Sequence, residues 1–385
     1  MKKSGVLFFF LSLCVSGCSS LTKSGGPPNQ FVIEKPFVRA TIQGQYLQGR
    51  RIHRFQPLLF KNMVITGNGI DGIMAYDKSS GHEIWRYPIF DGVEGGAILE
   101  KGRLYFGAGD GQFYCMDAQT GKVIWSSPLK AEGLSRPTLD GNTLFVLSGS
   151  NVARALNKDN GQLLWVYDRQ DRSSFSIRGG SQPAVDATNV YIGFSDGYLV
   201  ALSKTAGQVA WETNLNPGAK RFKDVDASPL IDGDSIYISS YDGGLYSVNK
   251  SSGTIQWSVD EGGYEKVEMS GKVLFLSTTS GKVLAVDKNS GKIHWEVQLK
   301  GNLATSPTYT QGLLIVGEYA GGLVFMDPLN GSVIKRFDPG MGVNSKATLD
   351  PKNQEVFFMS GGANLYGLTY RWEKYKNLWP WQESL

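Results

Sequence analysis

The sequence predicts an all-β protein: an eight-bladed β-propeller of four-stranded antiparallel blades, whose ring is closed by an N-terminal strand. The first observation is composition, because glycine supplies 48 of 385 residues and aromatic residues 12%, whereas charged residues supply only 19%. The second is a repeated motif whose glycines are 38 to 46 residues apart. The third is an alternation of short apolar runs with Gly-containing turns. Strands joined by tight turns, in repeats of this length, are typical of propeller blades.

Composition also excludes several classes of protein. Hydrophobic residues make up 41% of the chain, which is enough to bury a core and argues against disorder. The glycines have no period of three, which excludes collagen. The formal net charge of +4 is small, so we do not expect nucleic acid as a partner, because such a partner requires a basic stripe.

The first residues of the chain resemble a bacterial lipoprotein signal. Lys2 and Lys3 precede an apolar run over residues 5–15, which is shorter than the roughly 20 residues of a membrane span and has the length found in signal peptides. The sequence Val-Ser-Gly-Cys over residues 15–18 resembles a lipobox. Ser19 follows the cysteine, and a residue other than Asp at this position resembles the signal for sorting to the outer membrane.

These features predict a lipid anchor. We expect a lipoprotein signal peptide over residues 1–17 and a lipidated flexible tether over residues 18–30, with Cys18 as the lipid acceptor. An ordinary signal peptide cleaved nearby is the alternative. Cleavage removes Cys14, so Cys115 becomes a lone thiol and no intrachain disulfide is expected.

The repeat contains a start residue, a glycine and a tryptophan. The first copy runs from Asp77 through Gly81 to Trp85, and the distance of eight residues from start to Trp recurs in all six copies that contain Trp. The motif glycines are Gly81, Gly121, Gly161, Gly207, Gly253, Gly291 and Gly331. The tryptophans are Trp85, Trp125, Trp165, Trp211, Trp257 and Trp295. A Trp at the start of each outer strand can fill the wedge between neighbouring blades. A ligand cage is the alternative, which their placement in different blades disfavours.

The number of repeats predicts the number of blades. A residue position 20 before each motif start is proline in five repeats: Pro57, Pro137, Pro183, Pro229 and Pro307. An eighth motif start at residues 367–369 lacks the Gly and the Trp, so eight blades are expected over residues 31–370. The strand-like residues 37–42 are otherwise unassigned and are predicted to complete the last blade, which removes free edges. Residues 371–385 form a Trp-rich C-terminal tail outside the repeat.

Most candidate motifs for catalysis and metal binding lack the sequence context that these functions require. Residues 67–72 fit G-x-G-x-x-G, but a strand-like run follows where a dinucleotide-binding loop requires a helix, so we predict a turn. The three histidines show no ligand pairing. They are His53, His82 and His294. We therefore predict no metal, no cofactor and no enzyme activity.

Two consecutive links between blades are longer than the others. The distance from the Trp position to the next proline position is 18 residues from Trp165 to Pro183 and from Trp211 to Pro229, and 10 to 12 elsewhere. Equivalent loops of adjacent blades emerge on the same face, so we expect these two to be neighbours. Loops on a rigid scaffold are common sites of function.

The composition of these two links suits a protein contact. The first contains Phe175, Ile177 and Arg178, and the second contains Asp224 and Asp226. An apolar pair surrounded by opposite charges, with aromatic and Arg anchors, is typical of interfaces. The alternative is that Arg178 pairs with one of the aspartates within the fold, and the two interpretations can coexist. No calcium-loop pattern surrounds the aspartates.

The repeat also resembles a known family of enzymes. Copies of the form A-x-D-x-x-T-G-x-x-x-W are similar to those of the quinoprotein alcohol dehydrogenases, and this resemblance implies the propeller fold. Those enzymes typically carry two adjacent cysteines near the quinone, and this sequence has no adjacent cysteines. The resemblance therefore supports the fold and argues against quinone catalysis.

A second resemblance is more specific. The lipobox, the eight repeats and the two long links are similar to the BamB family, the propeller lipoproteins of the outer-membrane β-barrel assembly machinery, over residues 1–370. In that family two loops contact the periplasmic POTRA domains of BamA. The matching residues here are Phe175, Ser176, Ile177, Arg178 and Gly179 in the first loop, and Asp224, Val225 and Asp226 in the second.

This resemblance implies a function and its partners. The protein is expected to be a non-catalytic scaffold, lipid-anchored at Cys18 in the outer membrane and facing the periplasm. It would bind BamA POTRA domains and other members of the machinery, and help unfolded β-barrel chains to insert. The alternatives are a quinoprotein-like periplasmic enzyme, a glycan-binding propeller and a purely structural envelope propeller.

Overall fold

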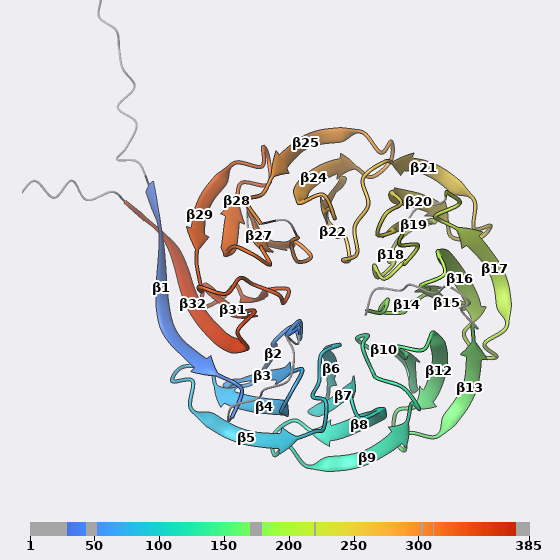
Figure 1. Ribbon diagram of the computed structural model, residues 1–385, viewed down its shortest axis with the longest axis horizontal. Helices are drawn as coiled ribbons and strands as arrows, with labels where there is room; N and C mark the ends of the chain where they lie inside the picture. Colours follow the sequence, from blue (N-terminus) through green and yellow to red (C-terminus); the bar gives the residue numbers. More distant parts are fainter. Residues whose placement is uncertain are drawn as a thin grey trace, which may run out of the picture. The chain divides into compact units, whose positions relative to one another are not determined.

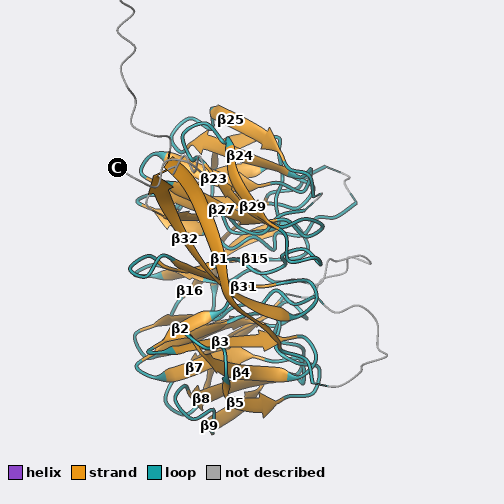
Figure 2. Cartoon of the chain, turned by 90° about the vertical axis from the view of Figure 1, so that its left-hand side faces the viewer, coloured by secondary structure: helices purple, strands orange, loops and turns teal. Residues whose placement is uncertain are grey.

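The computed structural model describes residues 29–43, 52–169, 179–218, 221–301, 303–310 and 312–374. Every regular element in these ranges is a β-strand, and the strands form eight four-stranded antiparallel sheets (Figures 1 and 2). The contacts divide the chain into a large unit over residues 33–371, which holds the ring of blades, and a small unit over residues 1–32 and 372–385. The predicted eight-bladed propeller is confirmed.

The first four blades each take four consecutive strands, numbered from the innermost to the outermost. The strands are β2 (Leu58–Phe60), β3 (Met63–Asn68), β4 (Gly72–Asp77), β5 (Glu83–Pro88); β6 (Ala97–Glu100), β7 (Arg103–Gly107), β8 (Gln112–Asp117), β9 (Val123–Pro128); β10 (Thr138–Asp140), β11 (Thr143–Leu147), β12 (Val152–Asn157), β13 (Leu163–Asp168); β14 (Ala184–Val185), β15 (Asn189–Gly193), β16 (Tyr198–Ser203) and β17 (Val209–Asn214).

The next three blades follow the same order, and the last blade takes its outermost strand from the start of the chain. The strands are β18 (Leu230–Asp232), β19 (Ser235–Ser239), β20 (Leu245–Asn249), β21 (Ile255–Val259); β22 (Glu268–Ser270), β23 (Val273–Ser277), β24 (Lys282–Asp287), β25 (Ile293–Gln298); β26 (Thr308–Thr310), β27 (Leu313–Gly317), β28 (Leu323–Met326), β29 (Val333–Phe337); β30 (Thr348–Asp350), β31 (Glu355–Met359), β32 (Asn364–Lys374) and β1 (Asn29–Ala40).

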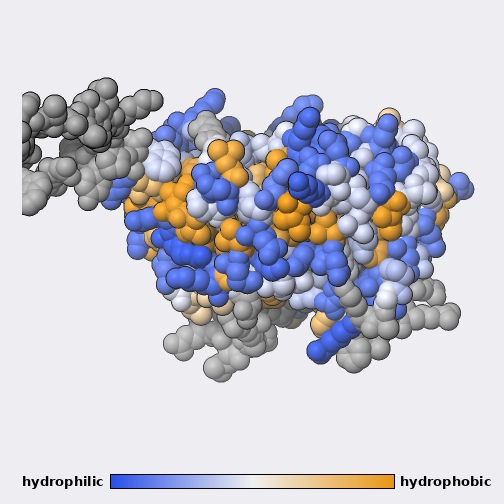
Figure 3. Space-filling model, turned by 90° about the horizontal axis from the view of Figure 1, so that it is seen from above, coloured by the Kyte–Doolittle hydropathy of each residue, from blue (hydrophilic) through white to orange (hydrophobic). Residues whose placement is uncertain are grey.

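The core lies between the blades. All six residues of β3 are buried, because both faces of a middle strand pack against neighbouring blades. One apolar cluster joins Ile65 and Ile73 of the first blade to Leu104 and Phe106 of the second. Each such side chain contributes about 1.5–3 kcal/mol when it leaves water. The outermost strands are more exposed, and Figure 3 shows separate apolar areas between hydrophilic ones on the rim.

The repeated motif is a turn between the third and fourth strands. The Asp77 carboxylate accepts hydrogen bonds from the backbone N–H groups of Ser79 (3.0 Å) and Ser80 (2.8 Å). Hydrogen bonds from these two serines lower the pKa of Asp77. Gly81 closes the turn with φ +68°, a left-handed conformation that glycine adopts without a Cβ clash.

Each motif Trp connects its blade to the next one. The Trp85 indole Nε1 donates to the Ala118 carbonyl oxygen of the following blade (3.2 Å), and a Cβ on Gly121 would lie 2.6 Å from the Trp85 ring. The motif glycine therefore admits the indole of the preceding blade. The same bond to a carbonyl of the next blade is made by Trp125, Trp165, Trp211, Trp257 and Trp295.

The N-terminal strand closes the ring, as predicted. β1 pairs with β32 as the fourth strand of the last blade, and the two run side by side in Figures 1 and 2. It begins at Asn29 and ends at Ala40, so it covers more of the chain than the expected residues 37–42. Arg39 ties it to the first blade by donating from Nε to the Gly81 carbonyl (2.8 Å) and from Nη2 to the Ser80 carbonyl (2.7 Å).

Candidate docking face and central cavity

The described ends of the two long links lie against each other. A Cβ on Gly179, which ends the first link, would lie 2.3 Å from Asp226 Oδ2 in the second. The Ser181 hydroxyl donates to the Ala227 carbonyl (3.0 Å), and the Gln182 backbone N–H donates to the Ser228 hydroxyl (3.0 Å). The face on which these links arrive, at the start of the inner strands, is called the link face below.

Several of the sequence-predicted site residues lie outside the described part of the chain. Three of them belong to the first long link and one to the N-terminal segment. They are Phe175, Ile177, Arg178 and Cys18. Their expected roles in binding and lipidation stay predictions. Within the described residues, no helix is long and apolar enough to cross a membrane.

The Asp-Val-Asp segment of the second link points in two directions. Val225 is fully buried in a cluster with Leu199 and Ile238, and its N–H donates to the Phe194 carbonyl (3.1 Å). Asp224 is also 0% exposed, so its carboxylate does not reach the surface. Asp226 is half-buried and lines a cavity on the axis of the ring.

An aromatic row leads from the second link toward that cavity. The exposed Arg221 guanidinium lies 5.0 Å from the centroid of the Phe222 ring, and Phe222 meets Tyr241 edge-on at 5.6 Å. Tyr241 and Tyr264 are 6.0 Å apart, and Tyr264 lines the cavity. Asp242 fixes the row because its carboxylate accepts a hydrogen bond from the Phe222 backbone N–H (2.9 Å). Arg and aromatic side chains of this kind are enriched at protein interfaces.

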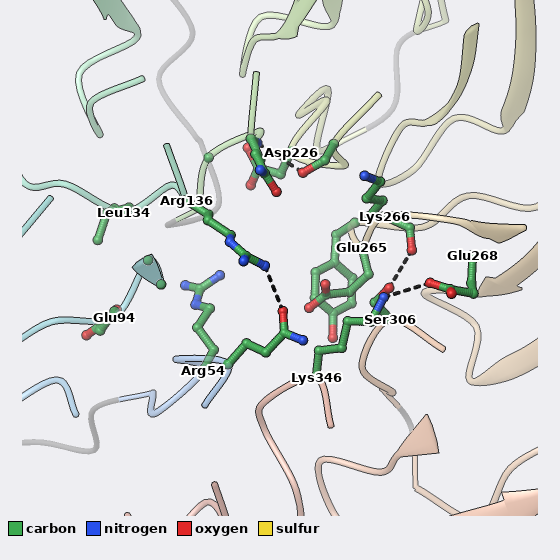
Figure 4. Close-up of a pocket in the computed structure, with 17 residues that line it drawn as sticks. Arg54, Glu94, Leu134, Arg136, Asp226, Glu265, Lys266, Glu268, Ser306 and Lys346 are labelled. Atoms are coloured by element: carbon green, nitrogen blue, oxygen red, sulfur yellow. Dashed lines mark hydrogen bonds and ion pairs between the residues drawn. The ribbon is translucent and has the colours of Figure 1, made fainter. Parts of the chain in front are cut away.

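The cavity has a volume of about 290 Å³ (Figure 4). Every blade contributes the residue directly before the proline position of its inner strand. These residues are Gln56, Gly96, Arg136, Gln182, Ser228, Lys266, Ser306 and Lys346. None of these eight residues was predicted from the sequence to belong to a site. The repeat alignment contains the signal, because the residue before the proline position is equivalent in all eight blades, although only five of them have proline there.

Charged side chains of both signs line the cavity. The cations are Arg54, Arg136, Lys266 and Lys346, and the acids are Glu94, Asp226, Glu265 and Glu268. The Lys346 ammonium pairs with the Glu268 carboxylate at 2.8 Å. Burial lowers the pKa of Arg136 and of Lys266. The charges of Lys346 and Arg136 add to the effect on Lys266, and Glu268 opposes it.

Two of the acids titrate near neutral pH. Burial raises the pKa of Asp226 to about 7, the charge of Asp224 raises it further, and Arg54 opposes both. Burial also raises the pKa of Glu265 to about 7, against the attraction of Arg54 and Lys346. The cavity therefore holds less negative charge near pH 7 than its composition indicates.

The other residues considered for chemistry are dispersed. Residues 67–72 form the end of β3 and the turn into β4, as predicted. His53 is buried, and burial lowers its pKa to about 4. Cys115 is buried, and burial raises the pKa of its thiol to about 11. No three His, Cys, Asp or Glu side chains cluster in a way that could hold a metal ion, within the ranges that the structure describes.

A family model described as outer membrane protein assembly factor BamB matches residues 69–290 and 242–372. The chain belongs to the BamB family. Among curated relatives, the BamB of Shewanella oneidensis is 30% identical over 139 residues, which cover 33% of this chain and 35% of that protein. A crystal structure of BamB from Moraxella catarrhalis covers 88% of this chain and all of that one, with a TM-score of 0.74 and 21% identity. The structural similarity to that BamB shows the shared propeller fold.

More distant similarity connects the BamB family to quinoproteins. The quinohemoprotein alcohol dehydrogenase ADH IIB of Pseudomonas putida is 28% identical over 134 residues, which cover 29% of this chain and 19% of that enzyme. The chain thus matches about a third or less of the length of these curated relatives. The expected resemblance to both families is confirmed.

Proposed function

We propose that this chain is a non-catalytic scaffold of the outer-membrane β-barrel assembly machinery, which binds the POTRA domains of BamA and assists the insertion of β-barrel proteins. One observation supports the binding site: the two long links meet at Gly179 and Asp226 on the link face, and the second link also carries an exposed Arg221 over the Phe222 ring. Membership of the BamB family supports the assignment to the assembly machinery.

The docking surface consists of both links. Arg221 and Phe222 supply a cationic and an aromatic contact, and the sequence-predicted Phe175, Ile177 and Arg178 supply the rest. Asp226 takes part at the edge of the cavity, where it can meet a partner or hold the first link in place. Asp224 does not meet the partner directly, because it is fully buried; its backbone carbonyl accepts a hydrogen bond from the Tyr241 N–H (2.9 Å).

The anchor completes the proposal. Lipidation at Cys18 holds the propeller at the periplasmic side of the outer membrane, and residues 18–30 serve as the tether. A single acyl chain gives only marginal membrane binding, so the several chains of a lipoprotein are needed for a stable anchor. A scaffold held in this way orients the POTRA domains and helps to deliver unfolded β-barrel chains.

The test is binding of the mature chain, without Cys18, to purified POTRA domains of BamA. We expect binding that Arg178→Glu and Arg221→Glu each weaken by about ten-fold or more, the size expected when a charged anchor is lost. The affinity of an Asp226→Ala variant for the POTRA domains tests whether the edge of the cavity takes part in binding. Asp224→Ala is unsuitable on its own, because removal of a buried charged group also affects folding.

The matched control is Asp159→Ala. Asp159 is exposed in the turn between β12 and β13, at the opposite end of the strands from the link face, so this variant should bind normally. Absence of binding by the wild-type chain contradicts the proposed function. Normal binding by folded Arg178→Glu and Arg221→Glu proteins contradicts the proposed surface.

A further inference from the structure

The cavity on the axis has donors that the surrounding residues do not satisfy. Arg136 donates from Nη1 to Gln56 Oε1 (3.0 Å), but its buried Nε atom has no hydrogen-bond partner. Among the described residues, none forms a hydrogen bond or ion pair with the Lys266 ammonium, although Lys266 lines the same cavity. A buried donor without an acceptor is destabilising, and more so when it is charged.

The cations of the cavity also repel one another. Burial lowers the pKa of Lys266 most, the charges of Lys346 and Arg136 lower it further, and Glu268 partly offsets them. In Figure 4 the side chains of Arg54 and Arg136 extend into the cavity from the same side. Glu268 neutralises Lys346 by direct contact at 2.8 Å. No equivalent contact within the described residues neutralises Lys266. An anion in the cavity would relieve this repulsion and accept a hydrogen bond from the Lys266 ammonium.

The acids of the cavity neutralise the positive charge of its cations only in part. Asp226 and Glu265 both have pKa values of about 7, so each is protonated in a large fraction of molecules at neutral pH. The cavity then carries an excess of positive charge. Its volume of about 290 Å³ leaves room for a small anion with its water.

We propose that this cavity is a binding site for a small oxyanion, either phosphate or a carboxylate, held by Arg136 and Lys266. The planar guanidinium matches the two oxygens of either group, and the ammonium adds a compact charge. Gln56, Gln182, Ser228 and Ser306 surround the site with neutral polar groups. The proposal rests on the cavity alone and does not depend on binding to BamA.

Calorimetric titration of the full chain in detergent tests the proposal, with inorganic phosphate in one arm and citrate in the other. We expect saturable binding of at least one anion at millimolar or lower concentration, with a matching rise in Tm. Arg136→Gln and Lys266→Gln should each weaken it by about ten-fold or more, because each removes a charged hydrogen-bond donor. Tighter binding of phosphate or of citrate shows whether the natural ligand of the cavity is a phosphate or a carboxylate.

The matched control is Lys122→Gln, which makes the same change of net charge. Lys122 is exposed in the turn between β8 and β9, away from the cavity, so its loss should leave binding unchanged. Circular dichroism and Tm in the absence of anion confirm that each variant is folded. The proposal is overturned if the wild-type chain binds neither anion, or if Lys122→Gln loses as much affinity as Lys266→Gln.

Discussion

The ring of Phe37 packs on Gly81 so closely that a Cβ on the glycine would lie 2.8 Å from the Phe37 ring. In the six other blades that have a motif glycine, a Trp occupies the corresponding place, as Trp85 does on Gly121. Phe37 lies in β1, the strand that closes the ring. An aromatic residue from the start of the chain therefore performs, at the closure, the packing that Trp performs elsewhere.

Phe37→Ala should destabilise the propeller by about 3–5 kcal/mol, because it removes a large buried ring between the first and the last blade. Denaturant unfolding of the variant and the wild type measures the difference. Phe90→Ala is the control, since Phe90 is 79% exposed and should change stability by no more than about 0.5 kcal/mol. Deletion of residues 31–45 should cause a larger loss. A truncated protein that melts like the full chain would contradict closure by β1.

Gly121→Ala should destabilise the protein by more than Gly141→Ala. Both glycines have positive φ, +68° and +56°, so both substitutions introduce a similar backbone strain. Only Gly121 lies under an indole, whereas Gly141 has no atom within 4 Å of the added Cβ. We expect a further cost of about 1–3 kcal/mol at Gly121, the usual penalty of overpacking. Equal Tm values for the two variants would show that the close packing of Trp85 on Gly121 does not affect stability.

The stability of the propeller should depend on pH through two acids of the cavity. Asp226 and Glu265 have pKa values of about 7 in the folded protein, whereas unfolded carboxyls titrate near pH 4. Between about pH 4 and pH 7 the folded state binds more protons than the unfolded state, so these groups lower stability as pH rises through this window. Asp226→Asn and Glu265→Gln should each reduce this fall in Tm between pH 5 and pH 8.

Asp234→Asn provides the control for that experiment. Asp234 is exposed in the turn between β18 and β19, so its substitution should leave the pH dependence of Tm as it is in the wild type. The same slope in the wild type and in all three variants would contradict a role for the two acids of the cavity.

Addition of pyrroloquinoline quinone and Ca²⁺ should not give the protein alcohol-dependent dye reduction. The physical reason is the absence from the sequence of the adjacent cysteines that quinoprotein dehydrogenases place near the quinone. A quinoprotein alcohol dehydrogenase assayed in parallel serves as the positive control. Turnover above the background would restore the enzyme hypothesis.

The sequence contains enough information for the blades because their determinants are local. Asp77, Gly81 and Trp85 form one turn and the strand after it, and their spacing recurs along the chain. The closing strand was also predictable, since the last blade lacked an outer strand and residues 37–42 were strand-like. Its true start at Asn29 depends on pairing with β32, a partner more than 300 residues away, which no local pattern specifies.

The site was harder to predict because it combines residues from separate blades. The cavity takes one residue from each repeat, and only a closed ring brings Arg136 and Lys266 together. The burial of Asp224 was also not visible in the Asp-Val-Asp segment. Alternation along a strand places Asp224 and Asp226 on the same side, but the irregular link directs Asp224 into the protein and Asp226 toward the axis.

The pairing of β1 with β32 also sets an order for folding. Among the described strands β1 comes first and β32 last, so the final blade cannot be completed until β32 has been synthesised. Each earlier blade can form as its own four strands become available, but the ring remains open until then. A nascent or truncated chain therefore exposes the edges of the first and last blades. A chain that terminates before β32 cannot close the ring.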